Sequence, residues 1–371
     1  MRIVIDMQGA QSSGSWNRGI GRYTMSLALA IARNHEKKHE ILLVLNGTFP
    51  ESIERIRANF EGVLPQQNIR VWHAPTPMAY RTSDNAPRRK AGELIREAFI
   101  ASLRPDAVLV SSLFEGLGDD SVTSIGRFSG DSVTAVILFD LIPYIHRRPY
   151  LENPTVKEWY LEKIEYLRRS DLHLAISESS RQEGIRHLAL SAEHCVNIST
   201  DADGQFEVMP ISTEAERILR DRYGLTRKFV MYTGGIDHRK NIESLISAYA
   251  KLSHELRRNH QLAIICSVQE HDRQRLTALA ESGGLSANEL VLTGFVPEDD
   301  LVFFYNLCAV FVFPSWHEGF GLPALEAMRC GAPVIASNVS SLPEVVGLEE
   351  ALFDPHSESA ISQAIARVLV D

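Results

Sequence analysis

Short apolar runs alternate with longer amphipathic stretches through the first half of the chain. The runs are typical of buried strands, and the stretches between them, such as "RYTMSLALAIARN", are typical of helices. The strand-like runs are "RIVIDM" (2–7), "EILLVLN" (40–46), "IRVWHA" (69–74), "AVLVSS" (107–112), "SVTAVILFD" (132–140) and "DLHLAISESS" (171–180). Strands that alternate with helices in this way predict a parallel, doubly wound sheet.

A second series of the same kind follows the polar stretch "STDADGQ" at 199–205. Helical segments such as "NIESLISAYAKLSHELRR" at 241–258 separate its strands. The strand-like runs are "KFVMYTGG" (228–235), "QLAIICSV" (261–268), "ELVLTGF" (289–295), "AVFVFPS" (309–315) and "APVIAS" (332–337). We therefore predict an α/β chain with two Rossmann-like domains, 1–204 and 205–371, joined by a linker near 199–210.

The loop "YTGGIDHRKN" at 232–241 is a candidate ligand site, because doubly wound sheets bind ligands outside the carboxyl ends of their strands. Gly234 and Gly235 would let a ligand approach the backbone closely. Arg239 and Lys240 arrive at the N-terminus of a helix, which already favours anions. A planar fork beside a point charge suits a diphosphate. The alternative is an ordinary turn that carries two surface cations.

The stretch "HEGFGLPALEAM" at 317–328 places two glutamates around a predicted helix start. Pro323 suits a first helical turn, so Glu326 is expected one turn into the helix and Glu318 in the loop before it. A carboxylate can hold a vicinal diol through two hydrogen bonds, so the pair could hold a ribose and a hexose joined by a diphosphate. Taken singly, Glu326 could also be a charge at a helix N-terminus, and Glu318 a residue on a surface loop.

The first domain has a glycine-containing loop, "GSWNRGIGRYT" at 14–24. Gly19 and Gly21 are expected to precede a helix, where the loop could approach a diphosphate. The alternative is a flexible entry to that helix. The loop is not a dinucleotide fingerprint, because Thr24 occupies the position of the third glycine, and this disfavours a nicotinamide dehydrogenase.

The segment "ILFDLIPYIHRRPY" at 137–150 is the other candidate in the first domain. Asp140 and His146 follow a buried strand and are therefore expected to point toward a cleft. A structural aspartate and a surface histidine are the equally supported alternative.

The composition excludes several classes of protein. The net charge of −9 argues against a dedicated nucleic-acid binder. The four cysteines have neither zinc nor disulfide spacing, which fits a reducing cytosol. The first residues resemble a strand rather than a signal peptide, and no run approaches the roughly 20 apolar residues of a membrane span. We predict a cytoplasmic protein. Basic clusters at 87–90, 146–148 and 168–169 are either solvated surface or points of peripheral membrane contact.

These motifs together resemble those of retaining glycosyltransferases of the GT-B fold, glycosyltransferase family 4. Glu318 and Glu326 match the E-x7-E signature, and the "GGIDHRKN", "GFVPEDDL" (294–301) and "APVIASNVSSLPEVVG" (332–347) segments follow in the order of the family. The resemblance covers essentially the whole chain and is more specific in the second domain. It is closest to bacterial mannosyltransferases that build lipopolysaccharide O-antigens.

The resemblance implies a role for each of the matching residues. Arg239 and Lys240 would hold the donor diphosphate and stabilise the leaving group, Glu326 would bind the ribose, and Glu318 would face the transferred sugar. The remaining donor-binding residues are Gly294 and Phe295, which would border the base, and the loop residues Gly319, Phe320, Gly321 and Leu322, whose backbone would meet sugar and phosphate. Relatives commonly have His-Asp-Leu where this chain has Phe139, so Asp140 would assist the acceptor and His146 would substitute for the missing imidazole.

The resemblance also implies the activity. The expected enzyme transfers a hexose, mannose from GDP-mannose, to a glycan or lipid-linked glycan acceptor, without a metal or other cofactor. One alternative is a UDP-sugar-dependent enzyme of the same fold, and another is a catalytically silent glycan-binding or scaffold module. Family members normally continue past "ISQAIARVLVD" with further helices, so the chain is expected to be either a short member or a module of a longer polypeptide.

Overall fold

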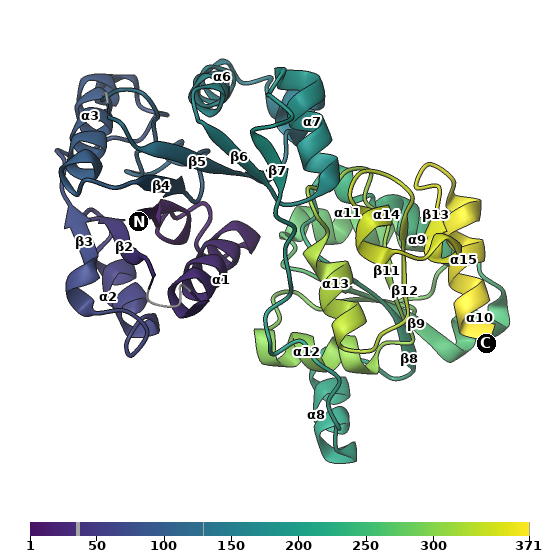
Figure 1. Cartoon of the computed structure of the whole chain (residues 1–371). Helices are drawn as coiled ribbons and strands as arrows, with labels where there is room; N and C mark the ends of the chain where they lie inside the picture. Colours follow the sequence, from purple (N-terminus) through teal and green to yellow (C-terminus); the bar gives the residue numbers. More distant parts are fainter. Residues whose placement is uncertain (35–37, 129, 371) are drawn as a thin grey trace. The chain divides into compact units, whose positions relative to one another are not determined.

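The computed structural model describes residues 1–34, 38–128 and 130–370. The chain forms two compact units, one made of Met1–Ile176 and Ser180–Ser199, the other of Ser177–Ser179 and Thr200–Asp371 (Figure 1). The division at Ser199 and Thr200 lies a few residues before the predicted boundary at 204, inside the predicted linker.

The first unit is built around a parallel sheet of seven strands in the order β3-β2-β1-β4-β5-β6-β7. Its strands are β1 (Arg2–Asp6), β2 (Glu40–Asn46), β3 (Ile69–Trp72), β4 (Ala107–Val110), β5 (Val133–Leu138), β6 (Leu172–Ala175) and β7 (Cys195–Asn197). The helices up to residue 199 are α1 (Gly19–Asn34), α2 (Pro50–Asn59), α3 (Ala86–Ser102), α4 (Ile142–Ile145), α5 (Arg147–Tyr150), α6 (Pro154–Arg168) and α7 (Glu178–Leu188).

The second unit has a parallel sheet of six strands in the order β10-β9-β8-β11-β12-β13, and α15 packs against α9 beside it (Figure 1). Its strands are β8 (Lys228–Thr233), β9 (His260–Ile265), β10 (Leu290–Leu292), β11 (Val310–Phe313), β12 (Val334–Ser337) and β13 (Leu352–Phe353). Its helices are α8 (Thr213–Tyr223), α9 (Ile242–Ala250), α10 (His254–Asn259), α11 (Glu270–Ser282), α12 (Glu298–Leu307), α13 (Leu322–Arg329), α14 (Leu342–Val346) and α15 (Glu358–Val370).

Each strand predicted from an apolar run is present, and the prediction of two doubly wound parallel sheets is confirmed. The central strands read as continuous apolar runs because helices cover both faces, as in β9, where every residue is buried. The sequence analysis missed two edge strands, β7 and β13. They have only three and two residues, too few for an apolar pattern to stand out.

Two helix boundaries differ from the predictions. Helix α1 begins at Gly19, so Gly19 and Gly21 lie in its first turn rather than before it. The predicted helix at 241–258 is two helices, because Ser253 caps α10 by accepting a hydrogen bond from the amide of Leu256. Within the described ranges, no helix is both long and apolar enough to cross a membrane.

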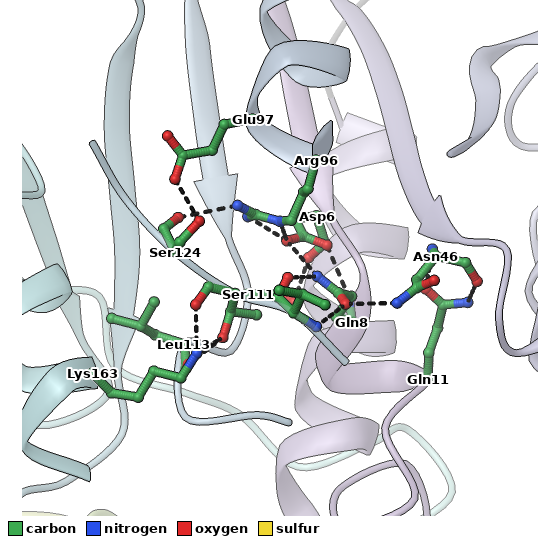
Figure 2. Close-up of polar contacts among 12 residues, drawn as sticks. Asp6, Gln8, Gln11, Asn46, Arg96, Glu97, Ser111, Leu113, Ser124 and Lys163 are labelled. Carbon is green, nitrogen blue, oxygen red and sulfur yellow. Dashed lines mark hydrogen bonds and ion pairs between the residues drawn. The ribbon is translucent and has the colours of Figure 1, made fainter. Parts of the chain in front are cut away.

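A buried polar network ties the carboxyl ends of β1 and β2 to α3 in the first unit (Figure 2). Asp6 ends β1, and Arg96 from α3 donates from Nε to its Oδ2 at 2.8 Å. Both side chains are 1% exposed. Gln8 donates from Nε2 to Asp6 Oδ2 at 3.3 Å, and Asn46 donates from Nδ2 to Gln8 Oε1 at 3.1 Å. The network pairs charges and amides that would each be costly to bury alone.

Replacing Arg96 with Ala should destabilise the first unit by about 3–5 kcal/mol, because Asp6 would be left buried without its partner. The measurement is urea unfolding followed by tryptophan fluorescence. Three of the four tryptophans, Trp16, Trp72 and Trp159, lie in this unit. The matched control is Arg70→Ala, on β3 in the same unit, where the side chain is exposed. An Arg96→Ala transition that coincides with that of the control would contradict the account of the network.

Candidate active site

The Arg239–Lys240 turn follows β8 in the second unit. Gly234 and Gly235 come directly after the strand, and the Tyr232 hydroxyl donates to the carbonyl of Gly235 at 2.7 Å. A short 3-10 helix, His238–Lys240, carries the two cations. The turn is therefore held to the end of its strand.

Asn241 fixes the end of this turn and the start of α9. Its backbone is in the left-handed region, with φ 58° and ψ 35°, which asparagine tolerates better than most residues. Its Nδ2 donates to the carbonyls of Pro314 at 3.0 Å and Pro355 at 2.9 Å. The sequence analysis placed a helix start near Asn241 but did not identify this positioning role.

The Glu318 carboxylate receives both cations of the turn. Lys240 Nζ lies 2.6 Å from Glu318 Oε1, and Arg239 Nη1 lies 2.9 Å from Glu318 Oε2. Arg239 Nη1 also donates to the carbonyl of His317 at 2.8 Å. The three residues that sequence reasoning assigned to the leaving group and the transferred sugar thus form one ion-paired group, which we call the donor-side cluster.

The electrostatics of the cluster favour the ionised carboxylate. Burial by itself raises the pKa of Glu318, but Lys240 and Arg239 outweigh burial and lower that pKa from 4.5 to about 2. Burial lowers the pKa of Lys240, and the charge of Glu318 opposes this shift. The carboxylate and at least the adjacent guanidinium are therefore charged at neutral pH.

Serines from the segment before α14 hold the Glu318 loop in place. The amide of Glu318 donates to Ser340 Oγ at 2.9 Å. Ser341 Oγ is buried, 3.0 Å from the carbonyl oxygen of Glu318 and 2.7 Å from that of Phe320. The sequence analysis included both serines in a family-like segment but assigned them no role. No periodicity or charge marks them, because their contacts join segments about twenty residues apart.

Gly321 makes the sharp entry into α13 possible. Its φ is +106°, a region that favours glycine, and an added Cβ would lie 2.6 Å from Leu342 Cδ2. Helix α13 then begins at Leu322 with Pro323 in its first turn, as predicted. Within the described ranges, the amides of Phe320, Gly321 and Leu322 donate to no other group. These N–H groups stand at a helix N-terminus, the arrangement that binds anions in many proteins.

Glu326 lies one turn into α13, as predicted, and is 3% exposed. Its Oε2 accepts a hydrogen bond from the hydroxyl of Tyr305 at 2.9 Å. Gly294 and Phe295 lie in the loop between β10 and α12, where Gly294 has φ +79° and the Phe295 ring is 78% exposed. Gly319 is buried between Glu318 and Phe320. The donor-binding roles of these residues remain predictions.

The candidate residues of the first unit have ordinary structural surroundings. Gly21 packs against the backbone of Trp16, since an added Cβ would lie 2.4 Å from the Trp16 carbonyl oxygen. An added Cβ on Gly19 would meet no atom within 4 Å, so packing does not require glycine there.

Asp140 and His146 lie at the two ends of the short helix α4. Asp140 Oδ1 accepts from the amide of Ile142 at 2.9 Å, which satisfies a free N–H of the helix start. His146 is exposed. Phe139 stands where relatives commonly have histidine, and its ring packs edge-on against Tyr23 at 5.3 Å. Among the described residues, no three His, Cys, Asp or Glu side chains are grouped so that they could hold a metal ion.

Residues 217–371 match the family described as glycosyl transferases group 1. The chain has the GT-B fold, with two doubly wound parallel-sheet units, and the residues that match this family lie in the second unit.

The chain is similar in sequence to a mannosyltransferase of Escherichia coli. It is 40% identical over 372 residues to the serotype-specific mannosyltransferase WbdA of Escherichia coli, an alignment that covers 100% of this chain and 44% of WbdA. It thus spans less than half the length of that relative.

Solved structures share the fold at low sequence identity. Sucrose-phosphate synthase of Thermosynechococcus elongatus superposes with a TM-score of 0.69 at 20% identity, covering 100% of this chain and 90% of that one. The Anabaena protein Alr3699/HepE in complex with UDP and glucose superposes with a TM-score of 0.66 at 18% identity and the same two coverages.

Replacing Glu318 with Gln should lower the free energy of unfolding at pH 7 by about 3 kcal/mol, because the two cations would lose their buried partner. The pKa of Glu318 is depressed on folding. Its contribution is therefore fully present above the ordinary value of 4.5 and is lost as the pH falls toward about 2. The stability difference between the wild type and the variant should shrink over that window in denaturant titrations.

The matched control is Glu349→Gln, which removes an exposed carboxylate from the same unit. This control should remain within about 0.5 kcal/mol of the wild type at every pH. A constant difference between Glu318→Gln and the wild type from pH 7 to pH 2 would be inconsistent with a carboxylate held ionised by Arg239 and Lys240.

Proposed function

We propose that this chain is a retaining, metal-independent mannosyltransferase. It transfers a mannosyl group from GDP-mannose to a hydroxyl of a glycan acceptor in the synthesis of O-antigen or a related polysaccharide. The observation that carries the proposal is the donor-side cluster, in which two cations and a carboxylate meet. Among the described residues, the nearby amides at the start of α13 donate to no other group. The likeness to WbdA over the whole chain supports mannose as the transferred sugar.

Arg239 and Lys240 are the groups that would receive the donor diphosphate. A guanidinium can hold phosphate oxygens in bidentate fashion, and an ammonium adds a compact charge. The amides of Phe320, Gly321 and Leu322 would add donors and the positive end of a helix. In the chain without ligand, the Glu318 carboxylate pairs with both cations and offsets one of their two positive charges. A bound diphosphate would supply negative charge to the same two cations and leave Glu318 able to accept hydrogen bonds from sugar hydroxyls.

The transfer step breaks the bond between C1 of the sugar and the oxygen of the diphosphate, and forms a bond from C1 to the acceptor oxygen. Negative charge builds on the diphosphate as its bond breaks, and Arg239 and Lys240 stabilise that charge. The acceptor hydroxyl attacks from the face that the diphosphate leaves and gives its proton to the departing phosphate oxygen. Attack on that face retains the α configuration. The buried carboxylate of Glu326 would hold the ribose hydroxyls.

The positively charged groups around the cluster support a reaction that needs no metal. A metal in nucleotide-sugar enzymes neutralises the leaving diphosphate, and here two side-chain cations and a helix start supply positive charge at that place. On the acceptor side, Asp140 and His146 are proposed to contact the acceptor, although the Asp140 carboxylate also supports the start of α4.

We further propose that the protein works in the cytoplasm at the inner face of the membrane, as one module of a longer polypeptide. Arg147, Arg148 and Lys90, from the basic stretches at 146–148 and 87–90, are exposed and would approach anionic lipids. The coverage of 44% of WbdA supports the modular arrangement. The acceptor would then be a glycan, either free or linked to lipid.

A UDP-sugar-dependent reaction is the second candidate, favoured by the structural likeness to Alr3699/HepE, which holds UDP and glucose. The nucleotide base would meet the loop that contains Gly294 and the exposed Phe295. Backbone contacts there would decide between guanine and uracil, so both donors enter the test below.

The test is a transfer assay with GDP-mannose and UDP-sugars, an α-mannoside acceptor and excess chelator, with products identified by mass spectrometry and NMR. We expect α-linked mannose from GDP-mannose only. Arg239→Ala should reduce the rate by about 100-fold or more, as loss of a charge-stabilising group does in other enzymes. Arg258→Ala, which removes an exposed arginine of α10, is the matched control and should leave the rate unchanged.

Several results would count against this assignment. Turnover of Arg239→Ala at the wild-type rate would remove the donor-side cluster from the mechanism. Transfer from a UDP-sugar alone would mean that the donor is a UDP-sugar and not GDP-mannose, while the enzyme would still be a glycosyltransferase. Absence of transfer and of nucleotide binding by the folded wild type would favour a glycan-binding or scaffold module.

A further inference from the structure

A hollow of about 350 Å³ lies in the first unit and is lined by the loops that follow β1 and β2 together with the start of α2. Its walls include Trp16, from the loop before α1, and Pro50, Glu51 and Arg55, from α2. We call it the Trp16 hollow. It shares no residue with the donor-side cluster, which belongs to the second unit.

Trp16 offers an apolar surface in an otherwise polar loop. Its side chain is 40% exposed, whereas the other three tryptophans are buried or half-buried. The guanidinium of Arg55 lies over the indole at 4.1 Å from the ring centroid and donates from Nη2 to the carbonyl of Ala10 at 2.7 Å. The stack holds the ring in one place and leaves its uncovered part at the hollow, where the apolar C–H face of a sugar could pack.

The polar groups of the hollow suit hydroxyls rather than an ion. Glu51 only accepts hydrogen bonds, and Arg55 only donates them. Within the described ranges, the Glu51 carboxylate makes no ion pair or hydrogen bond, and Arg55 hydrogen bonds only through Nη2. The two charges balance, so neither an anion nor a cation is favoured. A sugar hydroxyl both donates and accepts and can therefore use both groups.

The floor of the hollow is fixed before any ligand arrives. Gln11 and Asn46 pair reciprocally, with the Asn46 amide donating to Gln11 Oε1 at 2.8 Å and Gln11 Nε2 donating to the Asn46 carbonyl at 3.1 Å. Asn46 also donates to Gln8, so Gln11, which lines the hollow, is connected through Asn46 to the buried network around Asp6 (Figure 2). A preformed site loses little conformational freedom on binding.

We propose that the Trp16 hollow binds one pyranose residue of a neutral glycan, as a subsite additional to the donor-side cluster. The choice of a mannose chain as that glycan rests on the proposed function. The hollow would hold a residue of the acceptor chain by stacking on Trp16 and by hydrogen bonds to Glu51 and Arg55. Acceptors with several mannose residues should therefore bind more tightly than a single mannoside.

The test measures binding of a linear α-mannose oligosaccharide to the full chain by calorimetry or ligand-observed NMR, with and without saturating GDP. We expect saturable binding that GDP does not displace. Trp16→Ala should weaken binding roughly ten-fold, the equivalent of losing one aromatic contact, and Trp16→Phe should recover part of the loss. Glu51→Gln should also weaken binding. Glu54→Gln, the same change at an exposed position of α2 outside the hollow, should match the wild type.

The outcomes separate this proposal from the proposed function. Wild-type affinity in both Trp16→Ala and Glu51→Gln overturns the subsite, and so does a wild type that binds GDP but no oligosaccharide. If Trp16→Ala fails to fold, the oligosaccharide affinities of Glu51→Gln and Glu54→Gln are compared instead. Equal affinities of these two variants would overturn the subsite. Oligosaccharide binding that depends on Trp16, in a protein that binds no nucleotide, supports the subsite while the transferase assignment fails.

Discussion

The ion pairs of Glu318 with Arg239 and Lys240 are the interaction on which the donor side of this structure depends. They join the loop after β8 to the loop after β11, two strands that are neighbours in the sheet. A parallel sheet brings the carboxyl ends of such strands to one edge but does not fix the loops that leave them. The negative charge of Glu318 offsets one of the two positive charges, which lowers the cost of holding the three side chains largely out of solvent.

In the first unit, charged side chains are also buried at the carboxyl ends of the strands, but they are paired in a different way. There the carboxyl ends of β1 and β2 are filled by protein groups, because Arg96 pairs with Asp6 and the amides of Gln8 and Asn46 complete the network. Gln11, which pairs with Asn46, lines the neighbouring Trp16 hollow. The second unit therefore brings two cations and a carboxylate to this edge of its sheet, while the first has an aromatic ring beside one acidic and one basic side chain in the Trp16 hollow.

The sequence was sufficient to predict the class of fold and the position of the donor loops. Long apolar runs located the strands, and Pro323 located the start of α13. It could not predict that Glu318 binds both cations, because that geometry depends on the left-handed backbone of Asn241 and on contacts from Ser340 and Ser341. The pairing of Asp6 with Arg96 joins residues ninety positions apart and leaves no local pattern. The surroundings of the first-unit candidates were the least predictable, since the Asp140 carboxylate accepts from the amide of Ile142 and Gly21 lies against the backbone of Trp16. The roles expected of them in binding remain predictions.

We propose that the donor-side cluster binds a nucleoside diphosphate without a metal. The most direct measurement is the melting temperature of the wild type and of Lys240→Met in a panel of GDP, UDP and ADP with excess chelator, since a ligand that binds only the folded state raises its stability. The account predicts a rise with GDP for the wild type and little or none for Lys240→Met. An equal rise in both proteins, or no rise with any nucleotide, would contradict it.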